Sequence, residues 1–362
     1  MGPIENLSPY GFACLPNVDR HGQEIVVVAV AAHFELPRPG RVHRGPLVRC
    51  EQQPPPHFDD VYWGDPATTS LRYEGQSAYS RPGTDVYLSG SAHAPNGRPV
   101  RQLNVDLGVG PCRVRARVTG DRVWVSAGGT LRASPPAPFV RMPLVWERAY
   151  GGGDIDAGPR GYEARNPLGV GLYASVEAAT NAALPNIEDP RTPVGEPGSR
   201  PRPIGFGPVA RHWLPRASFA GTYDDHWKRS RAPLWPDDLD ERFFLAAAPG
   251  LSAIPHLQGG ESVVMSGVHP EGGFGFVLPT LRLSCKSAFR GGVERVGLRF
   301  DALILEPDEG RVSLILRANV QLGRGAEHRH SLVRALEAWE PMPPIAQAQA
   351  PARNVKPREA RS

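Results

Sequence analysis

The sequence has few cysteines and no close pair of them. Its four cysteines, at positions 14, 50, 112 and 285, are far apart, and no Cys-x-x-Cys pair or nearby Cys/His cluster occurs. This spacing argues against a zinc knuckle and against a scaffold held by disulfides. Isolated thiols of this kind are typical of buried positions in a protein of a reducing compartment.

Long apolar runs are also missing. The longest, Ile25 to Ala32, is far shorter than the roughly 20 residues that a membrane-spanning helix needs. The N-terminal stretch "MGPIENLSPYGFACLPN" lacks the basic and apolar regions of a secretory signal. We therefore expect a cytoplasmic protein with no membrane partner.

The sequence has little net charge and none of the common catalytic signatures. Its 41 basic and 37 acidic residues leave a formal charge of +4, which does not indicate a nucleic-acid partner. No Gly-x-Ser-x-Gly elbow and no P-loop occurs. The glycines of "YGGGD" (150–154) are expected to provide positive φ or close backbone approach instead. We expect no cofactor.

Glycine and proline, by contrast, are abundant. The 40 glycines and 40 prolines among 362 residues are about twice the usual share of roughly 12%. Such a composition predicts many turns and little long helix.

Alternating apolar and polar residues predict strands in the first 130 residues. Residues 24–36 have a continuous, β-branched apolar centre, which indicates a strand buried on both faces. Residues 100–110 and 112–127 alternate on either side of a Gly110-Pro111 turn, as a hairpin does, and "GDRVW" (120–124) starts another strand. Its row of Arg113, Arg115 and Arg117 could meet an acidic partner, but pairing with Asp106 and solvent is the favoured interpretation.

The remaining chain divides into an irregular middle and a second β region. Residues 132–250 are interrupted by Pro and Gly yet contain many aromatic residues, which indicates ordered loops held by buried rings. Alternation returns after residue 251, where "EPDEG" should join two strands. Helices are expected only at 172–184, 240–249 and 327–340.

These patterns predict a mainly β protein with antiparallel sheets, sandwich- or barrel-like, long irregular Pro/Gly-rich loops and a few short helices. The expected regions are an N-terminal β region (1–131), the middle segment (132–250), a C-terminal β region ending in a helix (251–343) and a flexible basic tail (344–362).

One acidic stretch, "AGTYDDHWKRSRAPLWPDDLDERFF" (220–244), suggests a metal site. Asp224, Asp225 and His226, with one of the carboxylates that follow, could hold Mn, Fe or Zn in a metal-dependent hydrolase. However, neighbouring side chains on an extended chain point in opposite directions, and turn or helix capping is the favoured role. Asp237 or Asp238 is expected to cap the short helix that follows.

A series of phrases along the chain carries a family resemblance. They include "RPGTDVYLSGSAHAP" (81–95), "PFVRMPLVWERAYGGGD" (138–154), "RPIGFGPVARHWLPR" (202–216) and "AGTYDDHWK" (220–228). In this order they resemble the bacterial family known as domain of unknown function 2169, from about Asn6 to Val320.

The resemblance implies a non-enzymatic adaptor or chaperone of a type VI secretion system. Such a protein binds a toxic effector and helps load it onto the spike and tip proteins; a structural component of the apparatus is an alternative. Aromatic and Arg residues favour interface anchors. The candidates in the middle segment are Arg141, Trp146, Arg148, Tyr150, Arg211, Trp213, Arg216, Tyr223 and Trp227.

Overall fold

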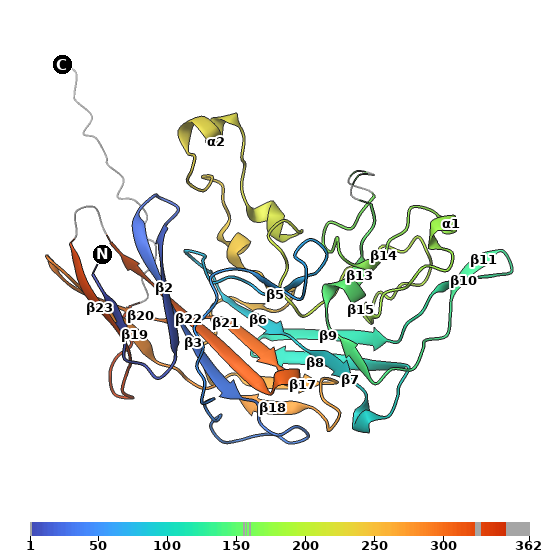
Figure 1. The fold of residues 1–362 in the computed structure, drawn as a ribbon, viewed down its shortest axis with the longest axis horizontal. Helices are drawn as coiled ribbons and strands as arrows, with labels where there is room; N and C mark the ends of the chain where they lie inside the picture. The colour runs from blue at the N-terminus through green and yellow to red at the C-terminus, as the bar shows by residue number, and fades with distance from the viewer. Residues whose placement is uncertain (1, 155, 157, 159–160, 323–326, 345–362) are drawn as a thin grey trace, which may run out of the picture.

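The computed structural model describes residues 2–154, 156, 158, 161–322 and 327–344. Strands dominate these residues, and the helices are short (Figure 1). Most strands belong to three open, mostly antiparallel sheets, which confirms the predicted mainly β class. None of the sheets formed by the described residues closes into a barrel.

The largest sheet has six strands, taken from both ends of the chain. In spatial order they are β16 (Ser252–Ala253), β6 (Thr84–Leu88), β21 (Arg299–Glu306), β22 (Arg311–Gln321), β3 (Glu24–Glu35) and β2 (Gly11–Val18). Strand β3 lies between β2 and β22 and is buried from Ile25 to Phe34, as predicted for a strand covered on both faces. The predicted "EPDEG" turn joins β21 to β22.

The second sheet has five strands and contains the predicted hairpin. Its order is β15 (Ile187–Glu188), β9 (Cys112–Thr119), β8 (Gln102–Val109), β17 (Ser262–Ser266) and β18 (Phe274–Val277). Val109 pairs with Cys112 across the Gly110-Pro111 turn, which confirms the hairpin. Each of the two large sheets thus combines strands from the N-terminal and C-terminal β regions.

A third sheet corrects one expectation. Its order is β1 (Ile4–Asn6), β23 (His328–Ala335), β19 (Leu283–Phe289) and β20 (Gly292–Gly297). The helix predicted for residues 327–340 is wrong, because most of that stretch is strand β23. This strand pairs with β19 on one side and β1 on the other, and these tertiary contacts outweigh the local helical pattern.

One hydrophobic core lies between the sheets. Alternate residues of β3, such as Val26 and Val28, belong to the same buried cluster as Val105 and Leu107 of β8. Cys285 of the four-stranded sheet joins this cluster. Since side chains alternate across a strand, the other residues of each sheet point outward and meet different surroundings.

The helices and the paired strands outside the three large sheets are all short. The helical elements that the structure describes are η1 (Pro95–Gly97), η2 (Trp146–Arg148), α1 (Val176–Ala179), η4 (Arg216–Phe219), α2 (Asp225–Ser230), η5 (Glu241–Phe244) and η6 (Pro307–Glu309). Paired short strands are β10 (Trp124–Ala127) with β11 (Thr130–Ala133), β12 (Arg141–Pro143) with β7 (Ser91–His93), β13 (Tyr150–Gly151) with β14 (Val170–Gly171), and β4 (Val61–Tyr62) with β5 (Leu71–Tyr73). The helices predicted at 172–184 and 240–249 are present as single turns, α1 and η5.

The glycines of "YGGGD" act as expected. Gly152 has φ 76° and Gly153 has φ 102°, values that favour glycine. A Cβ atom on Gly152 would lie 2.2 Å from the carbonyl oxygen of Gly169. Backbone conformation and close approach therefore both require glycine there.

The middle segment covers the outer face of the six-stranded sheet. Ile25 and Val27 pack against Tyr79, Phe243 and Phe244, and these side chains are buried like those of the core. Among the described residues, no helix is long and apolar enough to cross a membrane. Nearly all of the predicted basic tail, residues 345–362, lies outside the described residues.

Candidate protein-binding groove

The outer face of the five-stranded sheet carries a groove of about 1090 Å³. Strands β8, β9 and β17 form its floor, and the middle segment forms its rim at residues 189–191, 202–205 and 249–250. The charged side chains that line it are Asp106, Asp189, Arg113, Arg115, Arg117, Arg191 and Arg202. Arginines therefore outnumber carboxylates in the groove.

The period of strand β9 places three of these arginines in a row. Arg113, Arg115 and Arg117 alternate with core residues, so all three project from the outer face at intervals of about 6.7 Å. In the register with β8, Arg115 lies opposite Asp106, whereas Arg113 and Arg117 lie opposite Gly108 and Asn104. Only the central arginine thus faces an acidic residue across the hairpin.

Two of the groove arginines are paired with carboxylates. Arg115 binds Asp106, as predicted, and Ser266 donates a second hydrogen bond to that carboxylate at 3.1 Å. Arg191 binds Asp189 through two side-chain hydrogen bonds of 3.0 and 2.7 Å. These bonds, helped by the positive charge of Arg202, lower the pKa of Asp189.

The other three arginines lack such a partner. Within the part of the chain that the structure describes, no carboxylate forms an ion pair with Arg113, Arg117 or Arg202. Arg113 donates instead to the carbonyl oxygens of Gly110 and Cys112, at 2.7 and 2.6 Å. The buried Nε of Arg117 has no hydrogen-bond partner among the residues that the structure describes. Positive charge in the groove is therefore only partly neutralised.

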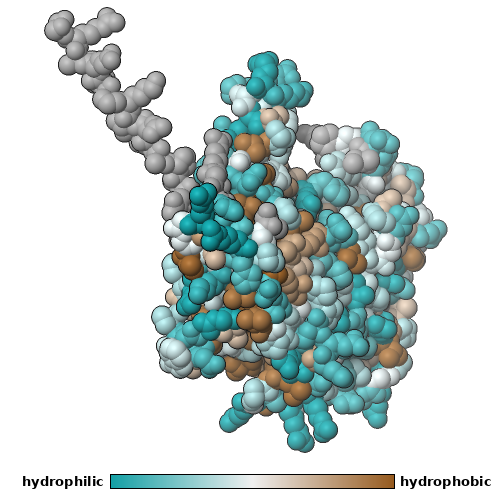
Figure 2. Space-filling model, turned by 60° about the vertical axis from the view of Figure 1, so that its left-hand side comes forward, coloured by the Kyte–Doolittle hydropathy of each residue, from teal (hydrophilic) through white to brown (hydrophobic). Residues whose placement is uncertain are grey.

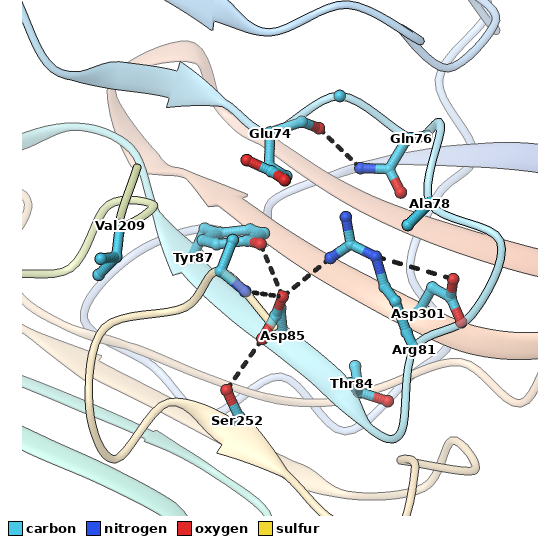
Figure 3. Close-up of polar contacts among 12 residues, drawn as sticks. Glu74, Gln76, Ala78, Arg81, Thr84, Asp85, Tyr87, Val209, Ser252 and Asp301 are labelled. Carbon is cyan, nitrogen blue, oxygen red and sulfur yellow. Dashed lines mark hydrogen bonds and ion pairs between the residues drawn. The ribbon is translucent and has the colours of Figure 1, made fainter. Parts of the chain in front are cut away.

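On the opposite side of the core, the outer face of the six-stranded sheet holds a buried carboxylate. Asp85 of β6 accepts hydrogen bonds from Arg81 and Tyr87 at 2.8 and 2.9 Å (Figure 3). The backbone N–H of Ala246 and the hydroxyl of Ser252 donate to it as well, at 2.7 and 2.9 Å. Asp85 therefore ties the middle segment to the sheet.

A second buried carboxylate lies beside the first. Asp301 of β21 lies 4.0 Å from the Nε of Arg81 (Figure 3). It also forms an ion pair with Arg317. Burial lowers the pKa of Arg317 to about 10, and the charge of Asp301 opposes this shift, so the guanidinium stays protonated at neutral pH. Gln76 accepts a further hydrogen bond from Arg317, at 3.1 Å.

Glu74 and Arg216 form a third buried pair, which involves one of the predicted interface residues. Arg216 donates to both oxygens of Glu74, at 2.6 and 3.1 Å, and to the carbonyl oxygens of Val209 and Phe243. Burial alone would raise the pKa of Glu74, but the adjacent Arg216 outweighs it and holds that pKa below its usual value. Arg216 therefore locks a loop rather than presenting its charge on the surface.

Three more of the predicted interface residues are buried. Trp146 and Trp213 pack edge to face with their ring centroids 6.0 Å apart, and the Nε1 of Trp146 donates to the carbonyl oxygen of Pro208 at 2.9 Å. Tyr150 belongs to a separate buried cluster with Trp124. These rings hold the irregular backbone together, as predicted for an ordered segment, and they are inaccessible to a partner in this structure.

The remaining five predicted residues are accessible but scattered. Arg141 binds Asp308 at 2.7 Å, and Arg148 binds Asn186 at 3.0 Å. Arg211 lies 3.3 Å from Glu74 at the edge of the covered face. Tyr223 and Trp227 pack together in the projecting arm formed by residues 220–238, with their ring centroids 4.7 Å apart. The structure does not bring these residues into one patch.

The projecting arm also contains the suspected metal ligands. It extends away from the body of the protein, and its tip is hydrophilic (Figure 2). Asp224 caps helix α2 by accepting from the backbone N–H of Trp227 at 2.8 Å, and Asp225 pairs with Lys228. The capping role that the sequence favoured is thus present at Asp224.

The other acidic residues of that stretch are engaged as well. The predicted cap at Asp237 or Asp238 is wrong, because Asp240 caps the turn η5 by accepting from the N–H of Arg242 at 2.9 Å. Asp238 instead accepts two hydrogen bonds from Thr222, which close the base of the arm. Nowhere in the described residues do three His, Cys, Asp or Glu side chains gather so that they could hold a metal ion.

Sequence reasoning singled out the arginine row of β9 but missed the rim of the groove. Arg191 and Arg202 lie far from β9 in the sequence and reach the groove only through the path of the middle segment. The signal that could have pointed to Arg202 is the basic run "EPGSRPRP" (196–203), in an otherwise ordered stretch. No local pattern indicates that it meets β9.

The fold and this groove define a mainly β protein with a basic, peptide-sized groove on one sheet and a covered, ionic face on another. The chain belongs to the family described as "Uncharacterized protein conserved in bacteria (DUF2169)", whose model matches residues 21–317. No curated protein and no solved structure matches the chain. The family resemblance noted in the sequence is thereby confirmed, within slightly narrower bounds.

Proposed function

We propose that this chain is a non-enzymatic adaptor or chaperone of a bacterial type VI secretion system, which binds a toxic effector in the cytoplasm and helps load it onto the spike proteins. The observation that carries the proposal is the groove on the five-stranded sheet, where Arg113, Arg117 and Arg202 have no carboxylate partner among the described residues. Guanidinium groups that form no ion pair with a carboxylate are suited to binding an acidic group of another molecule.

The rigidity of the surroundings supports a binding role. The groove floor is a hydrogen-bonded sheet, and its rim belongs to a segment fixed by buried rings and by Asp85. A surface that is already ordered loses little conformational entropy when it binds a partner. Ordered loops on a rigid scaffold are common places for recognition.

The test is recovery of the effector from the native host. Tagged protein should co-purify with the effector encoded beside its gene, and deletion of the adaptor gene should lower the level of that effector. If tagged protein recovers neither effector nor spike component and deletion leaves the effector level unchanged, the proposal fails. Retention of the chain in the assembled, secreted spike would instead indicate a structural component of the apparatus.

A further inference from the structure

The groove has a charge pattern with a definite period. Arg113 and Arg117 lie two positions on either side of Arg115, which Asp106 already neutralises. Arg202 adds a further positive charge from the rim, near Asp189, which is itself paired with Arg191. The charges left without a carboxylate partner thus lie along β9 and beside it.

The lining of the groove also indicates which kind of anion fits. No aromatic side chain is among the described residues that line it, so it has no ring on which a nucleic-acid base could stack. Apolar surface is present instead, at the half-exposed Val264 of β17 and at the partly buried Ile204 of the rim. A partner that combines carboxylates with aliphatic groups would match both features.

We infer that the groove binds an extended, acidic peptide segment of a protein partner, with Asp or Glu side chains four residues apart that face Arg113 and Arg117 of β9. An extended chain repeats every two residues at about 6.7 Å, which is the repeat of the arginine row. Carboxylates on one side of the segment pair with Arg113, Arg117 and Arg202, and its aliphatic residues contact Val264 and Ile204. Arg–carboxylate pairs have the planar geometry that gives such recognition its specificity.

This inference rests on the proposed function, because it names the part of the effector or spike protein that the adaptor holds. Carboxylates already in the groove favour peptide over nucleic acid, since Asp106 and Asp189 are both held by arginines there. A peptide carboxylate at the neighbouring positions would repeat the same contact.

The direct test uses the full chain and fluorescein-labelled ten-residue peptides, measured by fluorescence anisotropy. The alternating Glu-Thr peptide should bind more tightly than two probes: an alternating Gln-Thr peptide and an oligothymidine of equal length. Its affinity should fall as salt is raised, because exposed charge pairs are screened.

Variants locate the binding. The triple variant R113A/R117A/R202A should weaken binding of the alternating acidic peptide at least about tenfold. Its matched control, R98A/R132A/R290A, removes the same charge from exposed arginines outside the groove and should bind like the wild type. Thermal unfolding of both variants verifies that they fold.

If the triple variant R113A/R117A/R202A is poorly folded, a charge-reversal variant provides a second test of the groove. R113E/R117E should lose the acidic peptide and gain an alternating Lys-Thr peptide. Equal binding of the Glu-Thr and Gln-Thr peptides, tighter binding of oligothymidine, or unchanged binding by the triple variant would each overturn the inference.

The two proposals can fail separately. If R113A/R117A/R202A still recovers the effector from the native host as the wild type does, the groove inference fails and the adaptor function stands. If the wild type recovers no effector but binds the acidic peptide in the predicted way, the adaptor function fails and the groove inference stands.

Discussion

On the outer face of the six-stranded sheet, Arg81 and Arg317 are fully buried beside Asp85 and Asp301, whereas on the outer face of the five-stranded sheet, Arg113 and Arg117 have no carboxylate partner among the described residues. The difference follows from what covers each face. The middle segment lies across the first sheet and leaves the second with only a rim. A buried arginine must be neutralised where it lies, while an arginine at a groove is hydrated and remains available to a partner.

The largest expected effect comes from removing a charge on the covered face. Asp85→Asn should lower the free energy of unfolding by about 3 to 5 kcal/mol, because it leaves Arg81 buried and less well neutralised. Asp106→Asn, which removes a carboxylate from the open face, is the matched control. It should cost under about 1 kcal/mol, since its partner Arg115 is 64% exposed. Urea titration followed by tryptophan fluorescence measures both, and equal losses would contradict the comparison.

A second prediction concerns the pH dependence of stability that Glu74 contributes at the covered face. Glu74→Gln should destabilise the protein by about 2 to 3 kcal/mol at pH 7, because Arg216 loses a charged partner but keeps its carbonyl acceptors. The pKa of Glu74 is held below its usual 4.5 in the folded protein, so its contribution is complete above that value. The stability gap between wild type and variant should therefore shrink as pH falls below about 4.5. A gap that stays constant down to pH 3 would show that Glu74 is not the titrating group.

The third prediction tests the middle segment, which covers one sheet and borders the groove on the other. Gly152→Ala should lower the free energy of unfolding by about 1 to 3 kcal/mol, because the new Cβ would meet the carbonyl of Gly169 at a positive φ. In the same segment, Gly195→Ala meets no atom within 4 Å and should have little effect. Thermal unfolding of the two variants shows whether the loss of stability is specific to Gly152 or follows from any glycine substitution in the middle segment.

The smallest effect is expected in the projecting arm, which belongs to neither face. Asp224→Ala removes the cap of α2 and should weaken that turn by about 1 kcal/mol, whereas global stability should not change. Hydrogen exchange at the backbone amides of Trp227 and Lys228 should accelerate, since opening of the arm is local. Asp225→Ala, which leaves the cap in place, should not accelerate exchange at Trp227.

Local pattern predicted the strands that alternate or have continuous apolar centres. Strand β3 and the β8–β9 hairpin appear where the sequence placed them, because side-chain period and turn chemistry are local properties. Strand β23 could not be predicted in this way. Its pairing with β19 and β1 depends on chain segments far away, and its own residues favour a helix.

The binding surface was less predictable than the fold. Trp146, Trp213 and Arg216 were predicted as interface anchors from their residue types. Residue type does not determine whether a side chain is buried or exposed, and all three are buried. The arginine row of β9 could be predicted, because alternation along a strand places Arg113, Arg115 and Arg117 on the same face. Arg191 and Arg202 could not be predicted as groove residues, since only the path of the middle segment brings them next to β9.

The order of strands in the six-stranded sheet has a consequence for how the protein folds during its synthesis. Strand β3 leaves the ribosome early, but its central neighbour β22 comes from the C-terminal part of the chain, where Val28 meets Ala318. Strand β6 likewise waits for β21, with which it runs parallel. The most apolar stretch of the chain therefore has only β2 as a neighbour through most of translation, when its other, exposed edge is prone to aggregation. Closure of such distant pairs is slow, and the sheet can be completed only once β21 and β22 have been synthesised.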